Sequence, residues 1–314
     1  DLELTERDEN SGELPKSAEP FFLSPGVNEL TWEQTLESGT ITRHLKIHVP
    51  GTYPDHEPLP TVLAFHGNAS DAPEGAQPEA QWLGHLGPMV DQERFIGVYL
   101  RGVDGAWQLG SEAGDITTEE VVETIAYLQA RLAATAGVDG ATSYCLGSSN
   151  GAALCHYAAA NAGLFSGIGT EVSTLDEGDY PEPSLPKVSV VQMMNFKDAL
   201  IPYEGGDSPV GHTFMSAEEG IAAWAEHNGC DSEPEASEQD DPFSLRLTYS
   251  GCEEDSVVIH LGVMPIPWSD ICEEMGTEPP APEGCGETHT VSSEHFDTPG
   301  GAWRFAFDHL SGAL

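Results

Sequence analysis

The stretch Gly147-Ser148-Ser149-Asn150-Gly151 separates two segments of opposite character. Residues 143–146 before it suit a strand, and the alanine-rich segment after it, which reaches about Asn161, favours a helix. A Gly-x-Ser-x-Gly turn between a strand and a helix is typical of a sharp bend that presents a serine hydroxyl to a base. Because the chain contains 34 glycines in 314 residues, the strand-to-helix setting carries more weight than the five letters. We therefore expect Ser149 to be a nucleophile.

Outward from this turn, strand-like and helix-like segments alternate. Short apolar runs at 61–65, 95–100, 188–194 and 256–263 are typical of buried strands, and 41–50 alternates as a half-buried strand does. Thr117 and Glu120 form a capping-box pattern ahead of an apolar helical stripe, and residues 217–227 and 301–310 also favour helices. This order predicts an α/β fold with a mostly parallel central sheet flanked by helices.

The chain also divides by composition. Residues 1–28 are polar and acidic, with prolines at 15, 20 and 25, which indicates an extension or linker. Residues 29–314 contain all the predicted strands and helices, so we expect them to form one catalytic domain.

Charge excludes several classes of partner. The sequence has 53 acidic against 11 basic residues, a net charge of -42, which repels nucleic acids and anionic lipid surfaces. No apolar run approaches the roughly 18 residues of a membrane span, so we expect no membrane insertion. We also expect the chain to be a monomer. Acidic clusters such as 231–241 lack the ordered spacing of a calcium loop. We therefore expect a solvated acidic surface and no metal site.

Six cysteines, at positions 145, 155, 230, 252, 272 and 285, favour disulfides over metal binding, since no Cys-x-x-Cys pair occurs. The chain begins at Asp1 without a methionine, as a processed chain would. We accordingly expect secretion into an oxidising compartment.

Candidate partners for Ser149 follow other strand ends. After the run at 61–65 comes His66-Gly67-Asn68, where a backbone N–H of Asn68 or its neighbour Ala69 could stabilise an oxyanion together with the N–H of Asn150. Asp198 follows the strand at 188–194 and is the expected acid. Glu204 and Asp207 are alternatives to it.

Twelve histidines compete for the role of base. His289 lies after the last predicted strand and before the last helix, which completes the order Ser, Asp, His. His295 is its rival, while His260 falls inside a predicted strand and His309 inside the last helix.

The order of these motifs resembles the polyhydroxybutyrate depolymerase and feruloyl or acetylxylan esterase group of α/β-hydrolases, over about residues 38–312. The most specific part is Asp198 followed by Ile201-Pro202-Tyr203-Glu204-Gly205-Gly206, similar to the family's Asp-x-x-Val-Pro-Tyr-x-Gly-Gly. The resemblance implies an α/β-hydrolase fold and a secreted serine esterase without a cofactor. Its expected substrate is a polyester such as polyhydroxybutyrate, or alternatively a feruloyl or acetyl ester of plant polysaccharide. It also implies a disulfide between Cys230 and Cys252.

The chain departs from this family around the base. His289 is followed by Thr290-Val291-Ser292 instead of the family's Trp-Pro-Gly context, and an insertion with Trp268 precedes it. Cys272 and Cys285 could brace that insertion. Cys145 and Cys155 would then remain, on the strand and helix of the turn, where a bond requires Cα atoms within roughly 7 Å and is not expected.

Two tryptophans and two other functions stay open. Trp107 and Trp268 could each contact the acyl group of a substrate or simply pack in a loop. A non-catalytic binding module on the same fold, and an acyltransferase that uses the same acyl-enzyme, are the alternatives to a hydrolase.

Overall fold

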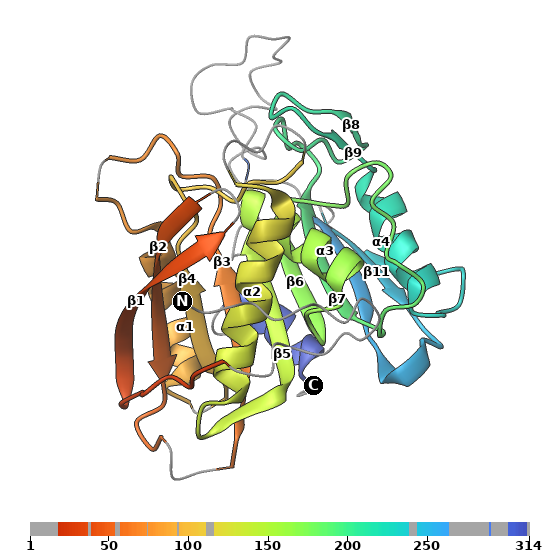
Figure 1. Ribbon diagram of the computed structural model, residues 1–314. Coiled ribbons are helices and arrows are strands. Elements are labelled where there is room, and N and C mark those ends of the chain that lie inside the picture. The colour runs from red at the N-terminus through yellow and green to blue at the C-terminus, as the bar shows by residue number, and fades with distance from the viewer. Residues whose placement is uncertain are drawn as a thin grey trace, which may run out of the picture.

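The computed structural model describes residues 18–36, 39–53, 57–73, 75–92, 94–110, 116–238, 244–263, 289 and 301–312. Within these residues a ten-stranded sheet forms the centre of the molecule, and a small two-stranded sheet lies beside it (Figure 1). The strands are β1 (Gly26–Leu36), β2 (Gly39–Val49), β3 (Leu59–Phe65), β4 (Ile96–Leu100), β5 (Val138–Ser148), β6 (Gly167–Glu171), β7 (Ser189–Asn195), β8 (Gly206–Asp207), β9 (Thr213–Phe214), β10 (Glu235–Glu238), β11 (Ser244–Tyr249) and β12 (Val258–Val263). The α-helices are α1 (Gln81–Val90), α2 (Thr118–Ala133), α3 (Asn150–Ala162), α4 (Ala217–His227) and α5 (Gly301–Leu310), and short 3-10 turns lie at Pro78–Ala80 and Glu253–Asp255.

The sheet order is β1-β2-β4-β3-β5-β6-β7-β12-β11-β10. The six strands from β4 to β12 in this order run parallel to their neighbours, and an antiparallel pair closes each edge. β3 and β4 exchange places relative to their chain order. β5, which leads into Ser149, lies near the middle of the sheet. The prediction of a mostly parallel sheet flanked by helices is confirmed, and the arrangement is that of the α/β-hydrolases.

Helices cover both faces of the sheet. α2, α3 and α4 lie on one face, and α1 and α5 lie on the other (Figure 1). Successive residues of β3 alternate between the two: Leu63 packs with the α2 and α3 side, and Val62 packs with the α1 and α5 side. Because both faces are buried, the central strands are nearly continuous apolar runs.

The start of the folded domain lies earlier than the boundary expected between residues 28 and 29, which falls inside β1. Phe21 is already buried, its N–H donates to Thr135 Oγ1 at 2.9 Å, and the Arg131 guanidinium lies 4.0 Å from the centre of its ring. The apolar ring and its cation–π contact anchor this segment although its composition is polar. Residues 1–17 of the predicted extension lie outside the described residues.

Candidate active site

The bend between β5 and α3 presents Ser149 in a strained conformation. β5 ends at Ser148, α3 begins at Asn150, and Ser149 between them has φ 53° and ψ -121°. Its N–H donates to Glu171 O at 2.9 Å, which fixes the bend against the end of β6. A side chain in such a sparsely populated region costs roughly 1–3 kcal/mol and persists only where the surroundings enforce it. The structure thus places Ser149 at the strand-to-helix turn that the sequence predicts.

Close backbone contacts explain the glycines around this serine. A Cβ on Gly147 would overlap the carbonyl of Gly151, and a Cβ on Gly151 would overlap that of Phe65. A Cβ on Gly67 would lie 3.3 Å from Ser149 Cβ. Glycine at these positions therefore lets the bend close and lets the His66-Gly67 loop approach the serine.

Glycine is usually less stabilising than alanine, but the strained backbone at Ser149 predicts the opposite order at this position. Ser149→Gly is expected to be more stable than Ser149→Ala by about 1 kcal/mol, because glycine adopts positive φ without the Cβ penalty. Urea unfolding of both variants measures this difference. Ser148→Gly and Ser148→Ala are the matched pair, and since Ser148 lies in β5, glycine should be the less stable there. If the difference in unfolding free energy between the glycine and alanine variants were the same at positions 148 and 149, backbone strain at Ser149 would be contradicted.

Three side chains that are distant in sequence meet at this bend. His289 Nε2 lies 2.7 Å from Ser149 Oγ, and His289 Nδ1 lies 2.7 Å from Asp198 Oδ2. Asp198 follows β7, and its side chain is fully buried while that of His289 is 20% exposed. Asp198 Oδ1 accepts the backbone N–H groups of Leu200 and Ile201, each at 2.9 Å. One carboxylate oxygen is thereby held by the loop, and the other faces the imidazole.

The rival acids and bases lie elsewhere. Glu204 and Asp207 are exposed, and Asp207 accepts a hydrogen bond from Thr213 Oγ1. His260 is buried inside β12, with Nε2 2.8 Å from the Tyr203 hydroxyl. His309 bonds to the carbonyl of Phe305 in its own helix, and His295 lies outside the described residues.

Two buried histidines predict lower stability in acid. Burial lowers the pKa of His260 to about 3 and that of His156 to about 4, against about 6.5 in an unfolded chain. Between these values the unfolded chain binds protons that the folded chain excludes, so stability falls as the pH drops below about 6.5, by up to about 1.4 kcal/mol per pH unit for each group. Urea midpoints between pH 7.5 and 5 should fall less steeply for His260→Gln than for wild type or for the exposed control His85→Gln. Identical slopes in all three would contradict a neutral buried imidazole.

The loop after β3 supplies candidate oxyanion donors. Ala69 N–H donates to Gly105 O at 2.8 Å, so of the two expected candidates the N–H of Asn68 is the one left to face a substrate. The Asn150 N–H belongs to the first turn of α3, where backbone N–H groups lack a partner within the helix. Burial lowers the pKa of His66, whose Nδ1 lies 2.7 Å from Gly67 O and whose Nε2 accepts the Gly102 N–H at 3.0 Å. His66 is therefore a neutral imidazole that holds the loop in place through hydrogen bonds at both ring nitrogens.

Trp107 is packed inside its loop. It is 3% exposed, its ring packs edge-on against Phe65, and its indole N–H donates to His66 O at 2.8 Å. The burial of this ring favours the packing role over a contact with the acyl group. Trp268, the other suggested contact, lies outside the described residues.

Two disulfides are present among the described residues. Cys230–Cys252 forms as the family resemblance implies. Cys145–Cys155 also forms, with Cα atoms 5.8 Å apart, which corrects the expectation that the strand and helix of the bend keep these residues apart. The sharp turn at Ser149 folds α3 back over β5 and brings the two cysteines within bonding distance. Cys272 and Cys285 lie outside the described residues.

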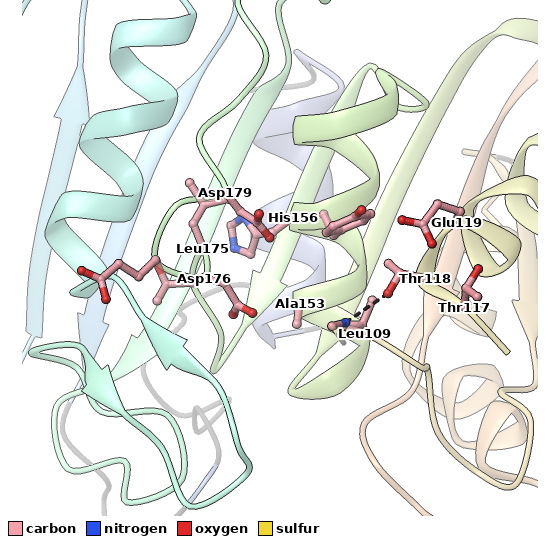
Figure 2. Close-up of a pocket in the computed structure, with 13 residues that line it drawn as sticks. Leu109, Thr117, Thr118, Glu119, Ala153, His156, Leu175, Asp176 and Asp179 are labelled. Carbon is pink, nitrogen blue, oxygen red and sulfur yellow. Dashed lines mark hydrogen bonds between the residues drawn. The ribbon is translucent and has the colours of Figure 1, made fainter. Parts of the chain in front are cut away.

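A pocket of about 480 Å³ is lined by α3, by the start of α2 and by the segment after β6. Ala153, one of its lining residues, lies about one helical turn beyond Ser149. Figure 2 shows Glu119 on one side of Ala153 and His156 of α3, and Asp176 and Asp179 on the other. Burial raises the pKa of Asp176 although His212 Nδ1 lies 2.6 Å from Oδ2. The described residues that line this pocket include no lysine or arginine, so an anionic group would bind there poorly.

Among the described residues, no group of three or more His, Cys, Asp or Glu side chains is arranged to hold a metal ion. None of the described helices is both long and apolar enough to cross a bilayer.

Solved structures that are similar to this one include esterases of low sequence identity. The acetyl xylan esterase from Aspergillus awamori is 16% identical over 76% of this chain and 92% of its own, with a TM-score of 0.45. A thermostable esterase is 14% identical over 63% of this chain and 52% of its own, at 0.46, and esterase 2 of Thermogutta terrifontis is 12% identical over 57% and 75%, at 0.43. No family model matches the sequence, and no curated protein does. The α/β-hydrolase fold of this chain accordingly rests on its own sheet order and on the turn at Ser149.

Proposed function

We propose that the protein is a serine hydrolase of carboxylic esters, with Ser149 as nucleophile, His289 as general base and acid, and Asp198 as the group that orients the imidazole. The observation that carries this proposal is the continuous chain of hydrogen bonds from Asp198 through His289 to Ser149, with both distances at 2.7 Å. The carboxylate accepts a hydrogen bond from the Nδ1–H group, so the proton stays on Nδ1 and Nε2 is free to accept the proton of the serine hydroxyl.

The reaction then follows from the positions of these groups. Ser149 Oγ attacks the ester carbonyl carbon while its proton passes to His289 Nε2, and His289 returns this proton to the alcohol as it leaves. Water enters, loses a proton to the same nitrogen and attacks the acyl carbon. The bond between this carbon and Ser149 Oγ then breaks, His289 returns the proton to Oγ, and the acid is released. The backbone N–H groups of Asn68 and Asn150 stabilise the oxyanion in both steps. No metal or organic cofactor takes part in this scheme.

The substrate that we propose is a neutral extracellular ester, an aliphatic polyester such as polyhydroxybutyrate. The pocket beside α3 favours a second candidate, an acyl group on a plant polysaccharide. Its carboxylates, among them Asp176 and Asp179, can accept hydrogen bonds from sugar hydroxyls, whereas a polyester chain offers them no donor. The disulfides Cys145–Cys155 and Cys230–Cys252 support secretion, because such bonds persist in oxidising compartments.

A serine-directed fluorophosphonate tests the chemistry independently of the substrate. We expect it to label wild type at Ser149 and to block hydrolysis of p-nitrophenyl butyrate. A chain that is neither labelled nor active would instead be a binding module. The same ester assayed with an added alcohol identifies an acyltransferase, if a new ester forms in place of butyric acid.

A substrate panel then separates the two candidates. It comprises polyhydroxybutyrate film, methyl ferulate, acetylated xylan and polyethylene terephthalate. Release of 3-hydroxybutyrate supports the polyester, and release of acetate or ferulate supports the polysaccharide ester.

A further inference from the structure

One loop contacts both sides of the proposed oxyanion site. The loop after β4 runs from Arg101 through Trp107, and it meets the His66–Ala69 segment at three points. Gly102 N–H donates to His66 Nε2 at 3.0 Å, Trp107 Nε1–H donates to His66 O at 2.8 Å, and Gly105 O accepts Ala69 N–H at 2.8 Å. This loop is called the bracket loop below.

The opposite side of the bracket loop is held by the side chain of Asn150. Asn150 Oδ1 accepts the backbone N–H of Trp107 at 2.7 Å, and Asn150 Nδ2 donates to the backbone carbonyl of the same residue at 3.0 Å. The amide thus pairs with both backbone polar groups of one residue, as a neighbouring strand would. Because each end of the amide faces a group of fixed polarity, only one orientation of the side chain satisfies both bonds.

The bracket loop is also fitted closely to its neighbours. A Cβ on Gly105, at φ +77°, would lie 2.6 Å from Ala69 O, and a Cβ on Gly102 would overlap Ala106 O. The two proposed oxyanion donors, the N–H groups of Asn68 and Asn150, come from segments 82 positions apart in the chain (150 - 68). The bracket loop is bonded to both segments, and it therefore fixes the distance between the two donors.

We propose that the Asn150 side chain is a positioning group that sets the geometry of the oxyanion site through the bracket loop, in addition to the backbone N–H that the same residue contributes. This inference rests on the proposed ester hydrolysis. A donor must lie about 2.7–3.1 Å from the oxygen as it becomes negative, and a misplacement of about 1 Å can cost about 100-fold in rate. Loss of the amide leaves the residue-150 N–H in place but releases the segment that carries it from the bracket loop.

The test combines two variants with a pair of substrates. Asn150→Asp keeps the shape but places a carboxylate oxygen against the Trp107 carbonyl, and Asn150→Ala removes the amide. Each should lower kcat for p-nitrophenyl acetate about 30- to 100-fold with KM within about threefold. The second substrate is the thiono ester of the same phenol, whose larger sulfur fits a closely set oxyanion site poorly. Wild type should prefer the oxygen ester strongly, and both variants should lose at least tenfold of that preference.

Asn161→Asp is the matched control, since it makes the same substitution in the last turn of α3, where Asn161 Nδ2 donates to Tyr157 O of its own helix. It should retain wild-type kcat and wild-type preference. A kcat within twofold of wild type in either Asn150 variant would overturn the proposal. A large loss with an unchanged oxygen-to-sulfur preference would also overturn it, because general loosening slows both esters alike. If wild type itself hydrolyses neither ester, the proposed function has failed instead.

Discussion

Replacement of Ser149 with alanine is expected to lower kcat for p-nitrophenyl butyrate by about 10⁶-fold. The substitution removes Oγ, which lies 2.7 Å from His289 Nε2, and with it the atom that would form the acyl-enzyme. The remaining donors can only assist direct attack by water, which accounts for a small residual rate. A spectrophotometric assay of p-nitrophenol release measures the effect. Labelling by a fluorophosphonate should disappear in parallel.

Ser148→Ala is the control for this result. Ser148 is the adjacent hydroxyl, and it lies in β5 one residue before the bend. It should retain most of the activity and all of the labelling. Turnover by Ser149→Ala above about 1% of wild type would show that another group performs the chemistry.

Asp198→Asn is expected to lower kcat by about 10⁴-fold. The reason lies in the two backbone N–H groups of Leu200 and Ile201, which donate to Asp198 Oδ1. In the variant they hold the amide oxygen, so the NH₂ group is turned toward His289 Nδ1. That nitrogen must then accept, the proton moves to Nε2, and Nε2 can no longer take a proton from Ser149.

Steady-state kinetics at saturating substrate measure this loss, with thermal unfolding to verify the fold. Asp207→Asn is the matched control, because Asp207 is one of the two alternative acids and is exposed. It should remain within twofold of wild type. A decrease of less than tenfold in Asp198→Asn would remove Asp198 from the proposed triad.

Local signals in the sequence predicted much of the fold. Helices α4 and α5 have the predicted bounds. The capping box of α2 forms in both directions, from Glu120 N to Thr117 Oγ1 and from Thr117 N to Glu120 Oε2. Caps and apolar periodicity act over a few residues, and tertiary contacts did not override them here.

Strands that depend on their neighbours could not be predicted. β6 reads Gly-Ile-Gly-Thr-Glu, which has little strand propensity. Its glycines are required by packing, since a Cβ on Gly169 would lie 2.6 Å from Leu146 Cδ2 and 3.0 Å from Ala306 Cβ. This segment becomes a strand because β5 and β7 pair with it on either side.

The sequence predicted the order of the three candidate catalytic residues, but it did not predict the contacts that position the oxyanion site. Ser149, Asp198 and His289 each follow a strand, and strand ends meet at one edge of a parallel sheet. The pairing of Asn150 with Trp107 leaves no sequence signal, because an amide after the serine and an aromatic residue 43 positions away form no recognisable spacing. Only the folded chain brings them together.

The Cys145–Cys155 bond has a consequence for how the protein must be produced. Both cysteines are 0% exposed, so neither oxidant nor reductant reaches the sulfurs once the core has closed. The bond must therefore form during folding, while the chain is still open. Protein folded in a reducing cytosol would retain two buried thiols that later exposure to air does not join. The quality of a recombinant preparation is then decided by the compartment in which the chain folds, and the assay buffer cannot correct it.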